Sequence, residues 1–202
     1  MWDALHVTAT ARGIRARNRA ALEAEILVVA RRHLAAQGAA ALSLRAIARE
    51  LGMASSALYR YVSSRDELLT LLIIEAYDSL NDAVDASVAD VADPLERFRV
   101  IGRATRAWAA RQPHDFALVY GSPVPGYRAP AERTVEPGTR VVGHLLGVLA
   151  ELAARWPAAG DERAARAGRA LAGLIADPAL DALGLPPILL SRGLAAWALV
   201  LG

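Results

Sequence analysis

Four residues that follow a glycine corner in the N-terminal third of the chain have side chains suited to contacts with nucleic acid. The stretch LSLRAIARELGMASSALYRYV, residues 42–62, has apolar residues at helical spacing on both sides of Gly52. Hydroxyls and a guanidinium at the start of a short helix can donate hydrogen bonds to phosphate, and the helix dipole favours the same anion. The residues that we expect to face outward from this corner are Ser55, Ser56, Tyr59 and Arg60.

The spacing around Gly52 matches what a helix-turn-helix requires. Two short helices cross steeply only if the first carries a small residue and the corner carries a glycine, and Ala48 and Gly52 fill these positions. Arg45 and Arg65 would then contact the DNA backbone on either side of the second helix. A plain helical hairpin with a glycine corner is the alternative that periodicity alone permits. The residues that we expect to face inward are Ile47, Leu51, Met53, Leu58 and Tyr61.

Charge is distributed unevenly along the chain. The net charge of the 202 residues is only +2, but residues 1–65 hold ten arginines and four acidic residues. A basic N-terminal third attached to an acidic remainder is typical of a protein that binds nucleic acid through one end. The imbalance therefore favours the helix-turn-helix over the plain hairpin.

The elements that must position these residues are all predicted to be helices. Asn18 is a candidate cap for a first helix that Gly38 ends, and Ser43 caps the short helix before the corner. Ser64, with Glu67 three residues later, predicts the start of a fourth helix. Asp93 is followed by a proline and then by an acid at the third helical position, which predicts another helix start.

The remainder of the chain is also predicted to be helical. Residues 121–138 are rich in proline and glycine, so we expect irregular structure there and a helix that resumes near Thr139. Further helices are expected from Asp161 to about Asp177 and from Pro187 onward. The fold class is therefore all-α, with an N-terminal three-helix head and a larger helical bundle. Residues 1–17 lack apolar periodicity and are expected to form a flexible basic arm carrying Arg12, Arg15 and Arg17.

Residues 18–69 resemble the TetR family of bacterial transcriptional repressors. The motif that carries the resemblance is ILVVARRHLAAQGAAALSLRAIARELGMASSALYRYVSSRDELL. Ala54 departs from the family pattern, which often has a capping serine or threonine there, and Tyr61 is either a DNA contact or a core residue. The resemblance implies a homodimer whose heads, residues 18–66, bind a palindromic DNA operator. The positions that it implies to face DNA or phosphate are Ser43, Arg45, Ser55, Ser56, Tyr59, Tyr61 and Arg65.

Two short segments of the body, GSPVPGYRAP and GLAAWALVLG, resemble the effector domain of one TetR subgroup. This resemblance implies that residues 67–202 hold a pocket for a small-molecule effector and a dimer interface. Aromatic and polar groups around an apolar cavity suit such a ligand, although core packing is the alternative for each residue taken singly. The candidate pocket residues are Trp108, Phe116, Tyr120, Tyr127 and His144.

The final segment, LAAWALVLG, is apolar on nearly all sides of a helix. Such a helix must be buried on more than one side, and a subunit interface would provide that burial. Family members usually continue beyond this point, so either a C-terminal truncation or a missing partner helix is expected after Gly202.

Other function classes lack support in the sequence. There are no cysteines, and the histidines at positions 6, 33, 114 and 144 have no paired spacing, so neither a metal site nor a cofactor is expected. No nucleophile, dinucleotide or phosphate-loop motif is present, which opposes an all-helical enzyme. The absence of a secretory signal and of a long apolar run predicts a cytoplasmic protein without a membrane span. We therefore expect a DNA-binding repressor released by a ligand, and the alternative is a DNA-binding protein without an effector.

Overall fold

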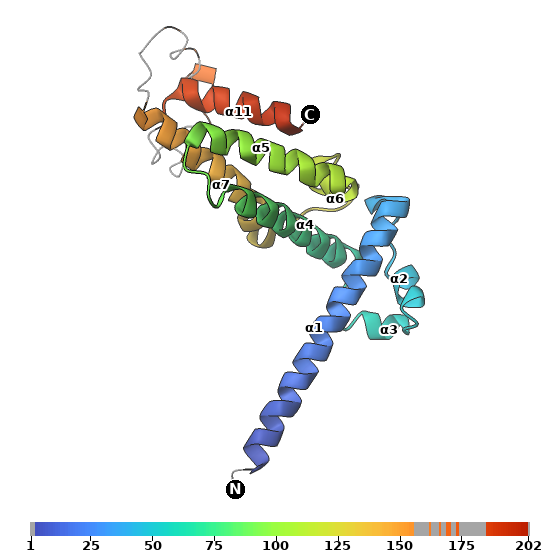
Figure 1. Cartoon of the computed structure of the whole chain (residues 1–202). Helices are drawn as coiled ribbons and strands as arrows, with labels where there is room; N and C mark the ends of the chain where they lie inside the picture. Colours follow the sequence, from blue (N-terminus) through green and yellow to red (C-terminus); the bar gives the residue numbers. More distant parts are fainter. Residues whose placement is uncertain are drawn as a thin grey trace. The chain divides into compact units, whose positions relative to one another are not determined.

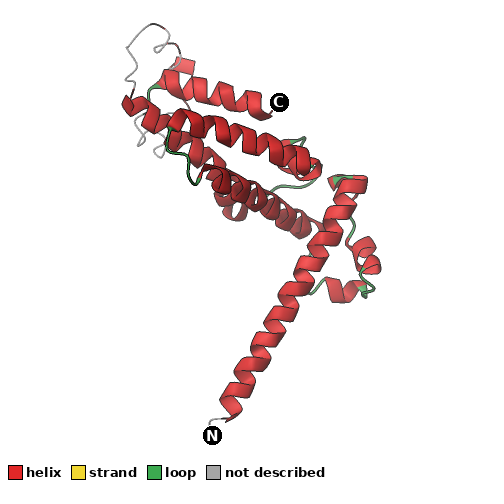
Figure 2. Cartoon of the chain, in the orientation of Figure 1, coloured by secondary structure: helices red, strands yellow, loops and turns green. Residues whose placement is uncertain are grey.

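The structure is a computed structural model that describes residues 3–155 and 185–201, together with residues 162, 166, 169, 170 and 173. The described part is helical and contains no strand (Figures 1 and 2), which confirms the all-α fold class. The helix expected from Asp161 lies mostly outside the described residues. The elements in chain order are α1 (Asp3–Gln37), the 3₁₀ turn η1 (Ala39–Ala41), α2 (Leu44–Glu50), α3 (Ser55–Leu58), α4 (Arg65–Val88), α5 (Pro94–Arg111), α6 (Pro113–Tyr120), α7 (Ala131–Arg155) and α11 (Pro187–Leu201).

The chain forms two compact units. The first unit, called the head, contains residues Met1–Glu75 and Ala117–Pro130, and the second, called the body, contains residues Ala76–Phe116 and Ala131–Gly202. Sequence reasoning placed the boundary between residues 66 and 67, at the start of α4. In the structure α4 continues without a break from the head into the body, and its first eleven residues, Arg65–Glu75, belong to the head.

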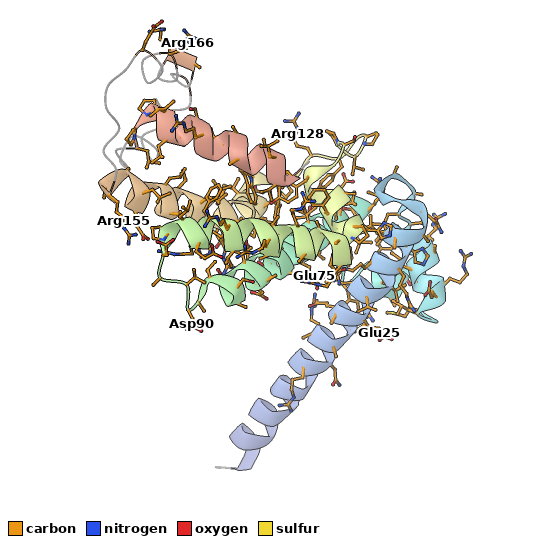
Figure 3. All side chains as sticks on the ribbon, turned by 45° about the horizontal axis from the view of Figure 1, so that its top comes forward. Glu25, Glu75, Asp90, Arg128, Arg155 and Arg166 are labelled. Atoms are coloured by element: carbon orange, nitrogen blue, oxygen red, sulfur yellow. The ribbon has the colours of Figure 1, made fainter. Side chains whose placement is uncertain are left out.

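The first helix begins much earlier than expected. α1 starts at Asp3, so the segment predicted to be a flexible arm is helical and Asn18 is no helix cap. The physical reason is composition: residues 3–17 are rich in alanine and arginine, which have high helix propensity, and contain no proline. Arg17 is exposed on this helix. Glu25 is exposed on it as well (Figure 3). Gly38 ends it as predicted, with φ of +75° and its amide bonded to the carbonyl of Leu34.

The head is built around one apolar core. Residues of α1, α2, α3 and α4 meet there, and each of Ile26, Ile47, Leu58 and Leu72 is fully buried. The inward positions predicted for the two short helices are thus occupied as expected, with Leu51, Met53 and Tyr61 packed at the edge of the core. The end of α6 and the loop that follows it also belong to the head, and Leu118, Val124 and Tyr127 pack against this core.

Serine and aspartate caps set the starts of three helices where sequence reasoning placed them. Ser43 accepts the amide of Ala46 through its hydroxyl at 3.4 Å, at the start of α2. Ser64 accepts the amide of Glu67 at 3.0 Å before α4. Asp93 accepts the amide of residue 96 at 2.8 Å before α5. These side chains satisfy amides that a helix start leaves without a backbone partner.

In the body, α5, α7 and α11 pack against one another and lie side by side (Figure 1). Trp108 on α5 is 2% exposed, and its indole nitrogen donates to the hydroxyl of Ser79 on α4 at 3.1 Å. α11 approaches α7 closely at Gly193, where a Cβ would lie 2.5 Å from Leu149 Cδ1. The body is therefore held by close helix packing around a buried indole.

The start of α7 differs from the prediction. We expected irregular structure until Gly138, but α7 begins at Ala131 and includes Pro137 in its interior. Proline has no amide hydrogen to donate to the carbonyl four residues earlier, so tertiary contacts must hold this part of α7 in place. Asn81 on α4 is 1% exposed and donates to the carbonyl of Pro137 at 2.9 Å, while Gly138 lies close enough to the Tyr77 ring that a Cβ would sit 3.2 Å from it.

Candidate nucleic-acid interface

The corner between α2 and α3 has a specific hydrogen-bonding pattern. The amide of Met53 donates to the carbonyl of Ala48 at 2.8 Å, and the amide of Gly52 donates to the carbonyl of Arg49 at 3.2 Å. These two bonds form a Schellman motif, in which the residue after the helix adopts a left-handed conformation. Gly52 does so, with φ of +65°. The corner is therefore the tight turn that sequence reasoning predicted.

The outward residues of this corner have the exposure that DNA contact needs. Tyr59 is 46% exposed, which is unusual for an aromatic ring, and Arg45 and Arg60 are also exposed. Ser56 is exposed and Ser55 is half-buried. The group combines hydroxyl donors, an aromatic face and guanidinium cations, and these are the side-chain types that contact phosphates and base edges.

Two predicted phosphate contacts have structural roles in the head. The Ser43 hydroxyl caps α2. The Arg65 guanidinium donates through Nη2 to the carbonyls of Ala39 and Ala40, at 2.9 and 3.2 Å, and lies 3.6 Å from an oxygen of Asp66. Arg65 therefore joins the start of α4 to the turn before α2, which holds α2 and α4 in a defined arrangement within the head.

Tyr61 has the intermediate position that the sequence left open. Its side chain is half-buried and packs against the head core. The guanidinium of Arg19 on α1 lies over the ring, 5.4 Å from the centroid, which is cation–π geometry. The core contact is thus observed, and the ring is also held in place from the α1 side.

Sequence reasoning missed Arg49. It is exposed on α2, one helical turn after Arg45, so the two arginines lie on the same face. The spacing of four residues was the available signal, although Arg49 was assigned no role from the sequence. Ala54 provides no side-chain cap for α3, as its residue type predicted.

The five candidate effector residues do not form one site. Tyr120 and Tyr127 belong to the head, where the Tyr127 hydroxyl is 2.9 Å from that of Thr70. Trp108 is a buried core residue of the body. His144 lines an open groove of about 370 Å³ between α4, α5 and α7, and Phe116 lines a different cavity of about 270 Å³.

The groove at His144 is dominated by ion pairs. Asp85 bonds both His144 Nε2, at 2.5 Å, and Arg140, at 2.7 Å. Arg97 makes a two-pronged contact with Glu151, at 2.9 and 2.8 Å, and these hydrogen bonds hold the pKa of Glu151 below its usual value. The cations of this groove therefore already have carboxylate partners.

No group of three or more potential metal ligands occurs in the part of the chain that the structure describes. None of the helices described is both long and apolar enough to cross a membrane.

Two family models match the chain. One, described as bacterial regulatory proteins, tetR family, matches residues 26–72, and the other, described as tetracyclin repressor-like, C-terminal domain, matches residues 98–202. The first match includes the whole Schellman corner, and the second match covers most of the body.

Individual relatives agree with the family models. The HTH-type transcriptional regulator Rv1816 of Mycobacterium tuberculosis is 56% identical over 131 residues, which are 64% of this chain and 56% of that protein. The match thus spans little more than half the length of this curated relative. The crystal structure of SCO4313 is 36% identical, with a TM-score of 0.72 over 91% of this chain and 82% of that one. The structure of AibR with isovaleryl coenzyme A and operator DNA shares the fold at 18% identity, with a TM-score of 0.56 over 89% of this chain and 83% of that one.

Rv1816 is named as an HTH-type transcriptional regulator, and the corner at Gly52 lies within residues 26–72, which the tetR family model matches. The chain belongs to the TetR family of bacterial regulatory proteins.

Proposed function

We propose that this protein is a dimeric transcriptional repressor in the cytoplasm that binds a palindromic operator through α2 and α3 and is released by a small-molecule effector. The observation that carries the proposal is that Arg45, Tyr59 and Arg60 are all exposed around the corner between α2 and α3, where the hydrogen bonds form a Schellman turn. α3 would enter the major groove, while the arginines contact phosphates. Ser55, Ser56 and the ring of Tyr61 complete the proposed DNA-facing surface.

A dimer is supported by the outer surface of α11. Leu199 is 80% exposed and Leu194 is 40% exposed on a helix that carries a single charged residue, Arg192. A second copy of the chain that packs against α11 would cover these side chains, and two heads are what a palindrome requires. Leu199→Glu should therefore lower the dimer fraction in sedimentation velocity, and an unchanged dimer fraction would contradict an interface on α11.

Release by an effector is supported by the hollow parts of the body and by chain connectivity. α6 begins in the body and ends in the head, so a ligand that displaces its first turn acts on a segment belonging to both units. AibR, which shares the fold, was solved with both a coenzyme A ester and operator DNA. A ligand releases DNA only if it binds one of two conformations more tightly, and the coupling is typically about 1–3 kcal/mol.

Fluorescence anisotropy on the DNA upstream of the protein's own coding region tests the DNA-binding part. We expect binding that weakens steeply with salt, because arginines displace counterions from phosphates. Tyr59→Ala should weaken binding by roughly tenfold or more, which corresponds to the loss of about 1–3 kcal/mol typical of one specific contact. Arg45→Ala should lower the salt slope by about one unit.

Arg128→Ala is the matched control for Arg45→Ala. Arg128 is an exposed arginine of the head, in the loop before α7 (Figure 3), so its replacement removes the same charge without altering α2 or α3. The proposal fails if the two variants lose the same affinity, or if the wild-type protein binds this DNA no better than a scrambled duplex of the same length while sedimenting as a dimer.

A further inference from the structure

A cavity of about 270 Å³ lies within the body, where α5, the first turn of α6 and the end of α11 meet. All of its lining residues belong to the same compact unit. Its volume is just below the roughly 300–1,000 Å³ of pockets for drug-sized molecules, so an occupant must be small. The residues that line it are Thr105, Arg106, Ala109, Phe116, Val200 and Leu201.

Thr105 provides an unsatisfied polar group in this lining. The residue is 1% exposed, and its hydroxyl oxygen has no hydrogen-bond partner among the residues that the structure describes. Buried hydroxyls nearly always have a partner, and one left alone is unfavourable because it has lost its hydration. A rotation about the Cα–Cβ bond is enough to direct a threonine hydroxyl toward a new acceptor. An acceptor atom placed in the cavity would supply the missing hydrogen bond.

Arg106 provides a charge beside the same cavity. Its side chain is exposed and makes no ion pair with any residue that the structure describes. Two other arginines of α5, Arg97 and Arg103, both have glutamate partners. A guanidinium without a protein carboxylate partner can bind an external carboxylate through two parallel hydrogen bonds.

The remaining lining is apolar. Ala109, Phe116 and the two C-terminal aliphatic residues of α11 expose only hydrocarbon, apart from their backbone. An apolar tail gains free energy by leaving water for such a surface. The lining thus combines one hydroxyl and one cation with an apolar wall.

We propose that this cavity is the effector site and that it takes a small amphiphilic carboxylate, an acid with an aliphatic tail. The carboxylate binds between Arg106 and the Thr105 hydroxyl, and the tail lies against Phe116 and α11. This inference rests on the proposed function, in which the body binds the effector. Phe116 is the last residue of its body segment, and Ala117 is the first residue of the segment that packs in the head. A ligand against Phe116 therefore acts directly next to a part of the chain that belongs to the head.

Isothermal titration calorimetry of the full chain with octanoate tests the site, and octylamine is the control for charge. Octanoate should bind, and octylamine should not, because its ammonium would face Arg106. Arg106→Gln should weaken octanoate by roughly tenfold or more, as expected for a hydrogen bond to a charged group, and Thr105→Val by roughly threefold to tenfold. Arg111→Gln removes the same charge from an exposed position on α5 that does not line the cavity, so it should leave the affinity unchanged.

Thermal unfolding shows whether Thr105→Val weakens octanoate binding through the lost hydroxyl or through a destabilised fold. Valine replaces a hydroxyl that has no partner with a methyl group of similar size, so the variant should unfold at the same temperature as the wild type or higher. The proposal is overturned if octanoate fails to bind, if octylamine binds equally well, or if Arg106→Gln and Arg111→Gln have the same effect.

DNA-binding measurements on the same variants distinguish failure of the carboxylate site from failure of the proposed function. DNA affinity measured without octanoate should be equal in the wild type, Thr105→Val and Arg106→Gln. Octanoate binding with these effects of the variants, but without any operator binding, would refute the proposed function and support the carboxylate site. Operator binding that octanoate does not weaken, together with no calorimetric signal, would refute the carboxylate site and leave DNA binding supported.

Discussion

The corner glycine allows a quantitative test of the head, because the same substitution should have opposite effects at two positions. Gly52 has φ of +65°, and a Cβ built there meets nothing within 4 Å. Gly52→Ala therefore introduces backbone strain without a clash. A left-handed conformation costs an L-residue roughly 1–2 kcal/mol. Alanine also restricts the unfolded chain, which offsets about 0.4–1 kcal/mol of this cost. We expect a net loss of about 1 kcal/mol of folding free energy.

Gly147 on α7 is the matched control. It is exposed and helical, and a Cβ there also meets nothing within 4 Å. Gly147→Ala should stabilise the protein by about 0.5–1 kcal/mol, because alanine loses less backbone entropy in a helix than glycine does. The two variants thus share their chemistry and differ in the sign of the expected effect.

Urea denaturation followed by circular dichroism measures both effects, and hydrogen exchange at the amides of α2 and α3 reports on the head separately. The midpoint should fall for Gly52→Ala and rise for Gly147→Ala, and exchange in α2 and α3 should accelerate only in the first. The reasoning is refuted if Gly52→Ala is neutral or stabilising, since that would mean that the corner does not require a left-handed residue.

Three further predictions concern single interactions. Asn81→Ala leaves the buried carbonyl of Pro137 without its side-chain donor and should destabilise the body by about 1–3 kcal/mol, which calorimetric unfolding can measure. Ser43→Ala removes the cap of α2 and should cost about 1 kcal/mol, whereas Ser43→Asp should retain most of the stability, and equal losses in both variants would contradict the capping role. Arg97 lowers the pKa of Glu151 in the folded protein from its usual value of 4.5. The pair therefore stabilises the folded protein fully at pH values above 4.5, and this stability is lost as the pH falls from 4.5 through the lower pKa of the folded state. Melting temperatures measured across this acidic range should fall less steeply in Glu151→Gln than in the wild type, and equal slopes would show that the pair contributes nothing.

The helix starts and the corner could be predicted from sequence because their causes are local. A serine or aspartate hydrogen-bonds an amide three residues away, and a glycine adopts a positive φ regardless of distant partners. The predictions at Ser43, Ser64 and Asp93 therefore hold in the structure. The inward face of the helix-turn-helix could also be predicted, since periodicity alone assigns residues to one side of a helix.

The predictions that failed depend on distant contacts or on competition between signals. Pro137 suggested a loop, but Asn81, far away in the sequence, holds its carbonyl inside α7. The absence of apolar periodicity before Asn18 suggested an arm, but propensity alone continues the helix to Asp3. For Arg65 the phosphate contact stays a prediction, and what the sequence could not predict is that its guanidinium also donates to the carbonyls of Ala39 and Ala40.

The sequence by itself determined the helical class, the glycine corner and the group of polar side chains that surround it. Each of these features follows from interactions between residues that are close in the sequence, so the sequence alone is enough to predict them. Only the tertiary structure decided that the loop after α6 belongs to the head and that the candidate effector residues divide between separate places. It also decided that Thr105 is buried without a partner beside Arg106. The physical reason is that cavities and unsatisfied groups arise where helices distant in sequence meet, and no local pattern specifies that meeting.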